Sequence, residues 1–130
     1  MQLQHTSTEL RGDVTVVTIL KATLEGIDES EYPSDRTRQL AVEFEQAVAD
    51  APGSVVVDIR DTEFLNHSSV VTLSQVVRTL VGHGKSGVIC CSSNIKAVLD
   101  IVKVSAHCPC RTSMEESLAA LSPGASDTGC

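Results

Sequence analysis

Two apolar, β-branched runs separated by one amphipathic stretch restrict the fold of this chain more than any other feature. Residues 14–20 (VTVVTIL) and 54–59 (SVVVDI) are nearly continuous in apolar character, which is typical of buried strands. Between these runs, Leu40, Phe44 and Val48 recur at helical spacing. A strand, a helix and a second strand in this order predict a parallel pair with a crossover helix.

The same alternation continues to the C-terminus, where capping residues precede apolar residues at helical spacing. The N-terminal "TEL" before Arg11-Gly12-Asp13 predicts a hairpin, and the acidic stretch after it predicts a long loop. The predicted elements are a strand at 8–10, a strand at 14–20, a loop over 21–33, a helix from 34 or 35 to "APG", strands at 54–59 and 87–91, helices after 66, 92 and 113, and an edge segment at 108–112.

A chain of 130 residues has room for one domain with its own core. The predicted fold class is α/β, with a mostly parallel sheet of four to five strands that begins with an N-terminal hairpin. About four helices pack against this sheet. The last residues, 123–130, are small and polar, and they predict a disordered tail.

Composition excludes several classes of function. The formal net charge is -7, and the ten Lys and Arg are scattered, so nucleic acid is not expected as a partner. Only Tyr32, Phe44 and Phe64 are aromatic, which leaves no stacking platform for single strands. No apolar run is long enough to cross a bilayer, and no leader pattern opens the chain, so we expect a cytoplasmic protein. The five cysteines lack the spacing of a disulfide framework, and reduced thiols are expected.

Three candidate chemical sites fail on geometry or spacing. His67 and Ser68 are adjacent, so at a helix start they point about 100° apart and cannot form a base and nucleophile pair. The segment His107-Cys108-Pro109-Cys110 has soft ligands but no second pair for zinc. The glycine-rich residues 82–87 follow a helix instead of opening one, which is the wrong order for a phosphate loop. We therefore expect no catalytic residue, no metal and no cofactor.

The polar segment 66–69 (NHSS) is the remaining candidate. Asn66 is a good N-cap, and Ser68 and Ser69 fall in the first helical turn, where unpaired N–H groups and the helix dipole favour an anion. A phosphate there would add nearly two negative charges without melting the helix. Ser68 and Ser69 are thus candidate phosphorylation sites, although a simple helix cap explains the same residues.

Residues 7–122 resemble a STAS domain, the fold of the anti-sigma factor antagonists and of the cytoplasmic tails of sulfate transporters. Three segments carry the resemblance in the family's order: "VVVDIRDTEFLNHSSVVTLSQVVRTL", "GKSGVICCSSNIKAVLDIVKV" and "TSMEESLAAL". Residues 1–6 would then form an N-terminal arm. Asn66 stands where the family usually has Asp, and His67 stands at its phosphorylatable Ser. His67 therefore indicates either a switch moved to Ser68 or Ser69, or a constitutive member.

The resemblance implies a non-enzymatic protein that binds a protein partner through the helix after residue 66. The partner would be an ATP-binding anti-sigma factor/serine kinase, and the alternatives are a stressosome-like scaffold or an accessory subunit of a transporter complex. The exposed side of that helix is expected to include Gln75, Arg78 and Thr79, with Ser69 and Thr72 nearer its start. The implied partner-binding residues are Asn66, His67, Ser68, Ser69, Thr72, Gln75, Arg78 and Thr79.

Overall fold

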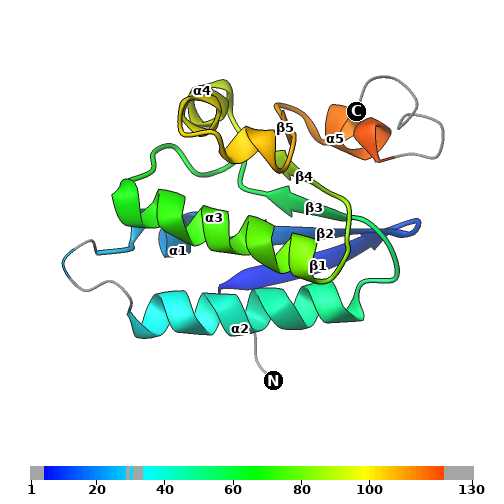
Figure 1. Ribbon diagram of the computed structural model, residues 1–130, viewed down its shortest axis with the longest axis horizontal. Helices are drawn as coiled ribbons and strands as arrows, with labels where there is room; N and C mark the ends of the chain where they lie inside the picture. The colour runs from blue at the N-terminus through cyan, green and yellow to red at the C-terminus, as the bar shows by residue number, and fades with distance from the viewer. Residues whose placement is uncertain (1–4, 29, 31–33, 122–130) are drawn as a thin grey trace.

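The computed structural model describes residues 5–28, 30 and 34–121, and these form one five-stranded sheet with helices packed against it (Figure 1). The predicted tail at 123–130 and most of the predicted arm at 1–6 lie outside these residues. The elements in chain order are β1 (Thr6–Arg11), β2 (Val14–Ile19), α1 (Lys21–Glu25), α2 (Asp35–Asp50), β3 (Val55–Asp58), α3 (His67–Gly82), β4 (Gly87–Cys90), α4 (Ser93–Ile101), the 3₁₀ turn η2 (Val104–Ala106), β5 (Cys110–Arg111) and α5 (Met114–Ala120).

The strands lie in chain order, β1-β2-β3-β4-β5. β1 and β2 are antiparallel, from Thr6 opposite Ile19 to Arg11 opposite Val14, and Gly12 makes the turn with a φ of 65°. The other three pairs are parallel. This arrangement confirms the predicted fold class: an α/β domain whose mostly parallel sheet starts with a hairpin.

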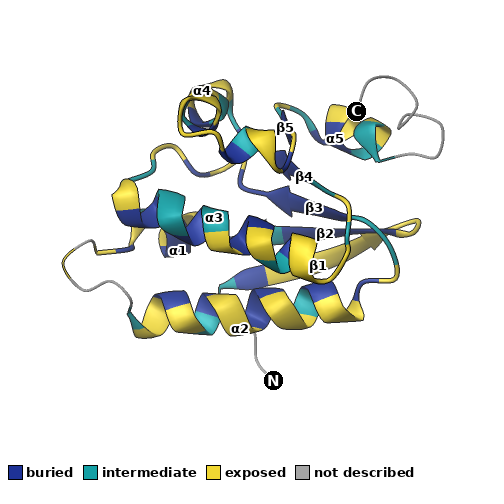
Figure 2. Ribbon diagram, in the orientation of Figure 1, coloured by how far each residue is buried: buried dark blue, intermediate teal, exposed yellow. Residues whose placement is uncertain are grey.

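The two faces of the sheet carry cores of different size, because successive strand residues point to opposite sides. Val17, Val57 and Ile89 belong to the larger core, which also includes buried residues of α2, α3 and α4. Val56 and Cys90 belong to a smaller core that α5 completes. Figure 2 shows α2 and α3 buried along one stripe and exposed along the other. No described helix is long and apolar enough to cross a membrane.

The predicted helix starts are confirmed by their caps. Ser34, Asn66, Ser92 and Ser113 each accept a hydrogen bond from the backbone N–H three residues further on. Such caps satisfy N–H groups that have no partner inside the helix, and each contributes about 1 kcal/mol. The local sequence therefore fixes where these four helices begin.

Three details differ from expectation. The segment 21–33 was expected to be a loop, but Lys21–Glu25 is a short helix that buries Thr23 and Leu24. β1 begins at Thr6, two residues before the predicted strand. The helical spacing of Ile95, Val98, Leu99 and Val102 predicts one buried face for the helix after residue 92, but Val102 is 44% exposed because α4 ends at Ile101.

The early start of β1 has a specific cause, a buried carboxylate on α2. Glu43 is 1% exposed, and its Oε1 accepts hydrogen bonds from the backbone N–H of His5 and Thr6, at 3.0 and 3.1 Å. The Thr6 hydroxyl donates a third bond to the same oxygen, at 3.1 Å. A buried charge needs such partners. Glu43 therefore fixes the first residues of β1 to α2.

Candidate functional site

The candidate site lies at the start of α3, beyond the end of β3, and the Asn66 side chain organises it. The Asn66 Oδ1 accepts a hydrogen bond from the Ser69 N–H at 2.8 Å. Its Nδ2 donates to the backbone oxygen of Ile27, also at 2.8 Å. One amide thus caps α3 and fixes the chain that follows α1.

Ser69 makes a second connection to the same region. Its hydroxyl lies 2.9 Å from the backbone oxygen of Leu24 and 3.0 Å from the Asn66 Oδ1, two acceptors that share its single proton. Ser69 is 1% exposed, and Ser68 is 4% exposed. The two candidate phospho-acceptors are therefore buried, and Ser69 is held against α1.

The expectation that Ser69 and Thr72 lie on the exposed side of α3 is wrong. Thr72 is 3% exposed, and its hydroxyl donates to the Ser68 backbone oxygen at 2.8 Å. The buried face is wider than the apolar stripe alone because α1 and α2 pack against it in addition to the sheet. The buried α3 residues are Ser68, Ser69, Thr72, Leu73, Val76, Val77 and Leu80.

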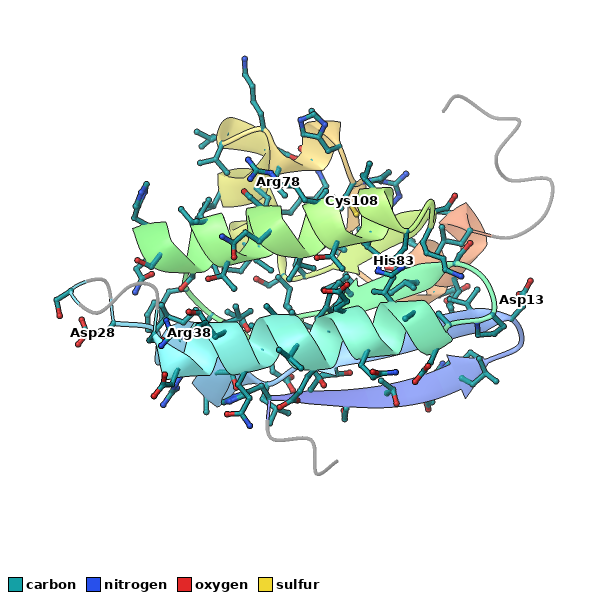
Figure 3. The ribbon with its side chains drawn as sticks, turned by 60° about the horizontal axis from the view of Figure 1, so that its bottom comes forward. Asp13, Asp28, Arg38, Arg78, His83 and Cys108 are labelled. Carbon is teal, nitrogen blue, oxygen red and sulfur yellow. The ribbon has the colours of Figure 1, made fainter. Side chains whose placement is uncertain are left out.

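The other expected site residues reach the surface. His67, Gln75 and Arg78 are exposed, and Asn66 and Thr79 are half-buried. His67 and Arg78 point in nearly the same direction, because eleven residues make about three helical turns, and Gln75 points roughly 60° from Arg78 on the same side of α3. The Arg78 side chain is labelled on α3 in Figure 3. The structure therefore brings three of the eight expected partner-binding residues together on the surface.

Sequence reasoning did not single out Phe64 and Leu20 as surface residues. Phe64 is 55% exposed and Leu20 is 40% exposed. The Lys21 Nζ lies 2.9 Å from the Glu63 Oε1, which places the segments that carry the two apolar side chains next to each other. The hydrogen bond between them raises the pKa of Lys21 and lowers the pKa of Glu63. The sequence feature that could have identified this surface is an aromatic residue, Phe64, in the polar connection between β3 and α3.

A second ion pair, between Asp58 and Arg60, lies at the end of β3. The Arg60 Nε and Nη2 each lie 3.0 Å from an oxygen of Asp58, a bidentate geometry that suits a partly buried carboxylate. This hydrogen bonding raises the pKa of Arg60. Both groups are satisfied by each other, so the pair stabilises the turn before α3.

The cysteine and histidine segment after η2 contributes to the core. His107 is exposed, whereas Cys108 and Cys110 are buried, and the Cys110 Sγ donates to the Cys108 backbone oxygen at 3.7 Å. Burial raises the pKa of the Cys108 thiol to about 12, which disfavours the thiolate that a metal would need. Among residues 5–28, 30 and 34–121, no group of three or more His, Cys, Asp or Glu side chains could hold a metal ion.

Comparison with known proteins gives a relative at the level of structure. No protein-family model and no curated protein match the chain by sequence. The crystal structure of an anti-sigma factor antagonist from Mycobacterium paratuberculosis superposes with a TM-score of 0.67, covering 89% of this chain and 92% of that chain at 20% identity. The chain therefore has a STAS-like fold.

Proposed function

We propose that this protein is a non-enzymatic regulator that acts by binding a protein partner at the start and along the exposed side of α3. The observation that carries the proposal is an exposed aromatic side chain, Phe64, directly before a helix whose side chains His67, Gln75 and Arg78 face solvent. Exposed aromatic and arginine side chains are enriched at protein interfaces. We call Leu20, Phe64, His67, Gln75 and Arg78 the α3 docking surface.

The partner that fits best is an anti-sigma factor/serine kinase, since the fold is that of a protein named as an anti-sigma factor antagonist. The protein would then act in the cytoplasm, in a signalling pathway that regulates transcription. A stressosome-like scaffold or an accessory subunit of a transporter complex would use the same surface. The identity of the bound protein separates these three roles.

The burial of Ser68 and Ser69 favours constitutive partner binding over a phosphorylation switch. A kinase must reach a hydroxyl and align it with a phosphate, but Ser68 and Ser69 are 4% and 1% exposed. Phosphorylation of Ser69 would also break its hydrogen bond to Leu24. A phospho-switched protein would therefore have to open the contact between α3 and α1 first, with Ser68 or Ser69 as the acceptor.

Affinity capture with point variants tests the proposal. Phe64→Ala should weaken capture of the native partner about tenfold or more, as expected for an interface anchor, and leave stability nearly unchanged. Val42→Ala is the matched control, because Val42 is also exposed, at 57%, but lies on α2. Equal capture by both variants would refute the α3 docking surface. The intact mass of the protein purified from its native cells reports whether any phosphate is present.

A further inference from the structure

A groove separates the second half of α3 from the chain that follows α4, and its chemistry differs from that of the rest of the molecule. Its volume is about 390 Å³, within the range of pockets that accept apolar side chains. We call it the α3–η2 groove. The residues that line it are Ser74, Val77, Arg78, Val81, Val102, Lys103, Val104 and His107.

Two basic side chains in this groove have no acceptor among the residues that the structure describes. Of the ten Lys and Arg residues, five form ion pairs with carboxylates. Three more, at positions 36, 85 and 111, donate to backbone oxygens. The remaining two are Arg78 and Lys103, for which no side-chain acceptor is found in the described part of the chain. Both line the α3–η2 groove, and no Asp or Glu is among its lining residues.

The backbone at Lys103 adds an independent observation. Lys103 has a φ of 66°, and it is the only non-glycine residue with a positive φ in the part of the chain that the structure describes. Glycine adopts this left-handed conformation without a steric penalty, whereas a lysine does not. Lys103 follows the C-cap residue of α4, the position where a left-handed residue commonly ends a helix and where glycine is the usual residue. A lysine at this position therefore has a local cost that its charge at the groove can explain.

The apolar part of the groove is also open. Val81 is 65% exposed and Val102 is 44% exposed; Val81 lies three residues after Arg78 on α3, and Val102 directly precedes Lys103. A ligand that fits must place apolar side chains against the valines and carboxylates against Arg78 and Lys103. The chain as a whole carries a net charge of -7, so an acidic ligand is repelled over most of the surface. Charge therefore directs such a ligand to this groove.

We propose that the α3–η2 groove binds an acidic, amphipathic helical segment of the protein partner. Apolar residues three or four positions apart on that segment would contact Val81 and Val102, and its Glu or Asp side chains would pair with Arg78 and Lys103. This mode is helix-in-groove recognition with complementary charge. The inference rests on the proposed function, because Arg78 belongs both to this groove and to the α3 docking surface.

Selection of random peptides on the full-length protein tests the groove. Phage that display random 16-residue peptides are panned on the wild type, and the enriched peptides are synthesised and titrated. We expect a net negative charge and apolar residues at helical spacing. Binding to the variant Arg78→Glu with Lys103→Glu should fall about tenfold or more, the size expected for losing two charge pairs.

A charge-matched variant provides the control. Arg11→Glu with Arg38→Glu changes the net charge equally, but both side chains are exposed and lie outside the groove lining. It should bind the selected peptides about as well as the wild type, within about twofold. Circular dichroism verifies the fold of each variant, and Arg78→Gln with Lys103→Gln replaces the reversal if the latter unfolds.

Three outcomes would overturn the inference. Selected peptides that are basic or uncharged, or that bind both charge variants equally, would show that the cations do not recruit an acidic segment. Self-association of the wild type in sedimentation velocity, abolished by the groove variant, would assign the groove to a second copy of this chain. Native partner capture that depends on Phe64 but not on Lys103, which belongs to the groove alone, would reject the groove and retain the proposed function. Capture that depends on Lys103 but not on Phe64 would retain the groove and reject Phe64 as the anchor of the α3 docking surface.

Discussion

The Ser69 hydroxyl donates a hydrogen bond to the backbone oxygen of Leu24 across 2.9 Å, joining residues 45 positions apart in the chain. Leu24 is one of the two buried residues of α1, and Ser69 is in the first turn of α3. The bond therefore connects the start of α3 to α1. Because isolated helices as short as α1 do not persist in water, α1 depends on tertiary contacts of this kind.

Ser69→Ala should lower the free energy of unfolding by about 1–2 kcal/mol, because the Leu24 oxygen loses a buried donor. Ser74→Ala is the matched control: its hydroxyl donates only to the Val70 oxygen, four residues earlier in the same helix. The control should change the free energy by less than about 0.5 kcal/mol. Urea unfolding measures both. A Ser69→Asp variant as stable as the wild type would contradict the view that this site cannot accept a phosphate without opening.

Glu43→Ala should destabilise the protein by about 3 kcal/mol, because three donors near the start of β1 lose their buried acceptor. Hydrogen exchange should increase first in β1. Glu43→Gln keeps one acceptor oxygen and should cost less, about 1 kcal/mol. Glu45→Ala, exposed on the same helix, is the control and should change stability little. Unchanged exchange in β1 after Glu43→Ala would show that the strand does not depend on this carboxylate.

Alkaline pH should destabilise the protein through its buried thiols. Burial raises the pKa of Cys108 to about 12, and burial also raises the pKa of Cys90. The folded protein therefore holds protons that the unfolded chain releases near pH 9, so stability is complete below about pH 9 and falls as the pH rises towards 12. Urea midpoints between pH 7 and pH 10.5 measure the loss.

Chemical labelling checks the same thiols separately. At pH 8, iodoacetamide should alkylate Cys90 and Cys108 only after unfolding, since both are buried and protonated. Cys108→Val should reduce the loss of stability at alkaline pH but not abolish it, because Cys90 remains. Rapid alkylation of either thiol in the folded protein would show that the core at β4 and β5 opens readily.

The sequence predicts the features of this fold that depend on near neighbours. Asn66 and Ser113 are recognisable as caps because each bonds to a backbone N–H three residues away. The burial of Ser69 depends on Leu24, which lies in a segment whose acidic composition predicts a loop. The partner of a polar helical residue is thus hidden whenever it belongs to an element that the sequence pattern misses.

The α3–η2 groove was hidden for a different reason. Arg78 is on a helix that the sequence predicts, but Lys103 follows another helix, and only the tertiary fold places both side chains along one groove. Whether a cation has an acceptor also depends on the tertiary structure around it. A scattered set of ten basic residues therefore predicts neither which of them are paired nor which two are left for a partner.

Lys103→Gly should separate stability from binding. Glycine adopts a φ of 66° without strain, which outweighs its larger entropy in the unfolded chain, so the free energy of unfolding should rise by about 0.5–1 kcal/mol. Binding of the selected acidic peptides should fall at the same time, because one of the two groove cations is gone. Thermal unfolding and peptide titration measure the two effects on the same sample.

Lys103→Ala is the control for this pair of effects, because alanine removes the charge but keeps the backbone strain of a side chain at positive φ. It should lose peptide binding as much as Lys103→Gly does, without the gain in stability. If Lys103→Gly binds as well as the wild type, the charge has no role in recognition. If both variants are equally stable, the left-handed backbone carries no strain, and the lysine needs no functional explanation at this position.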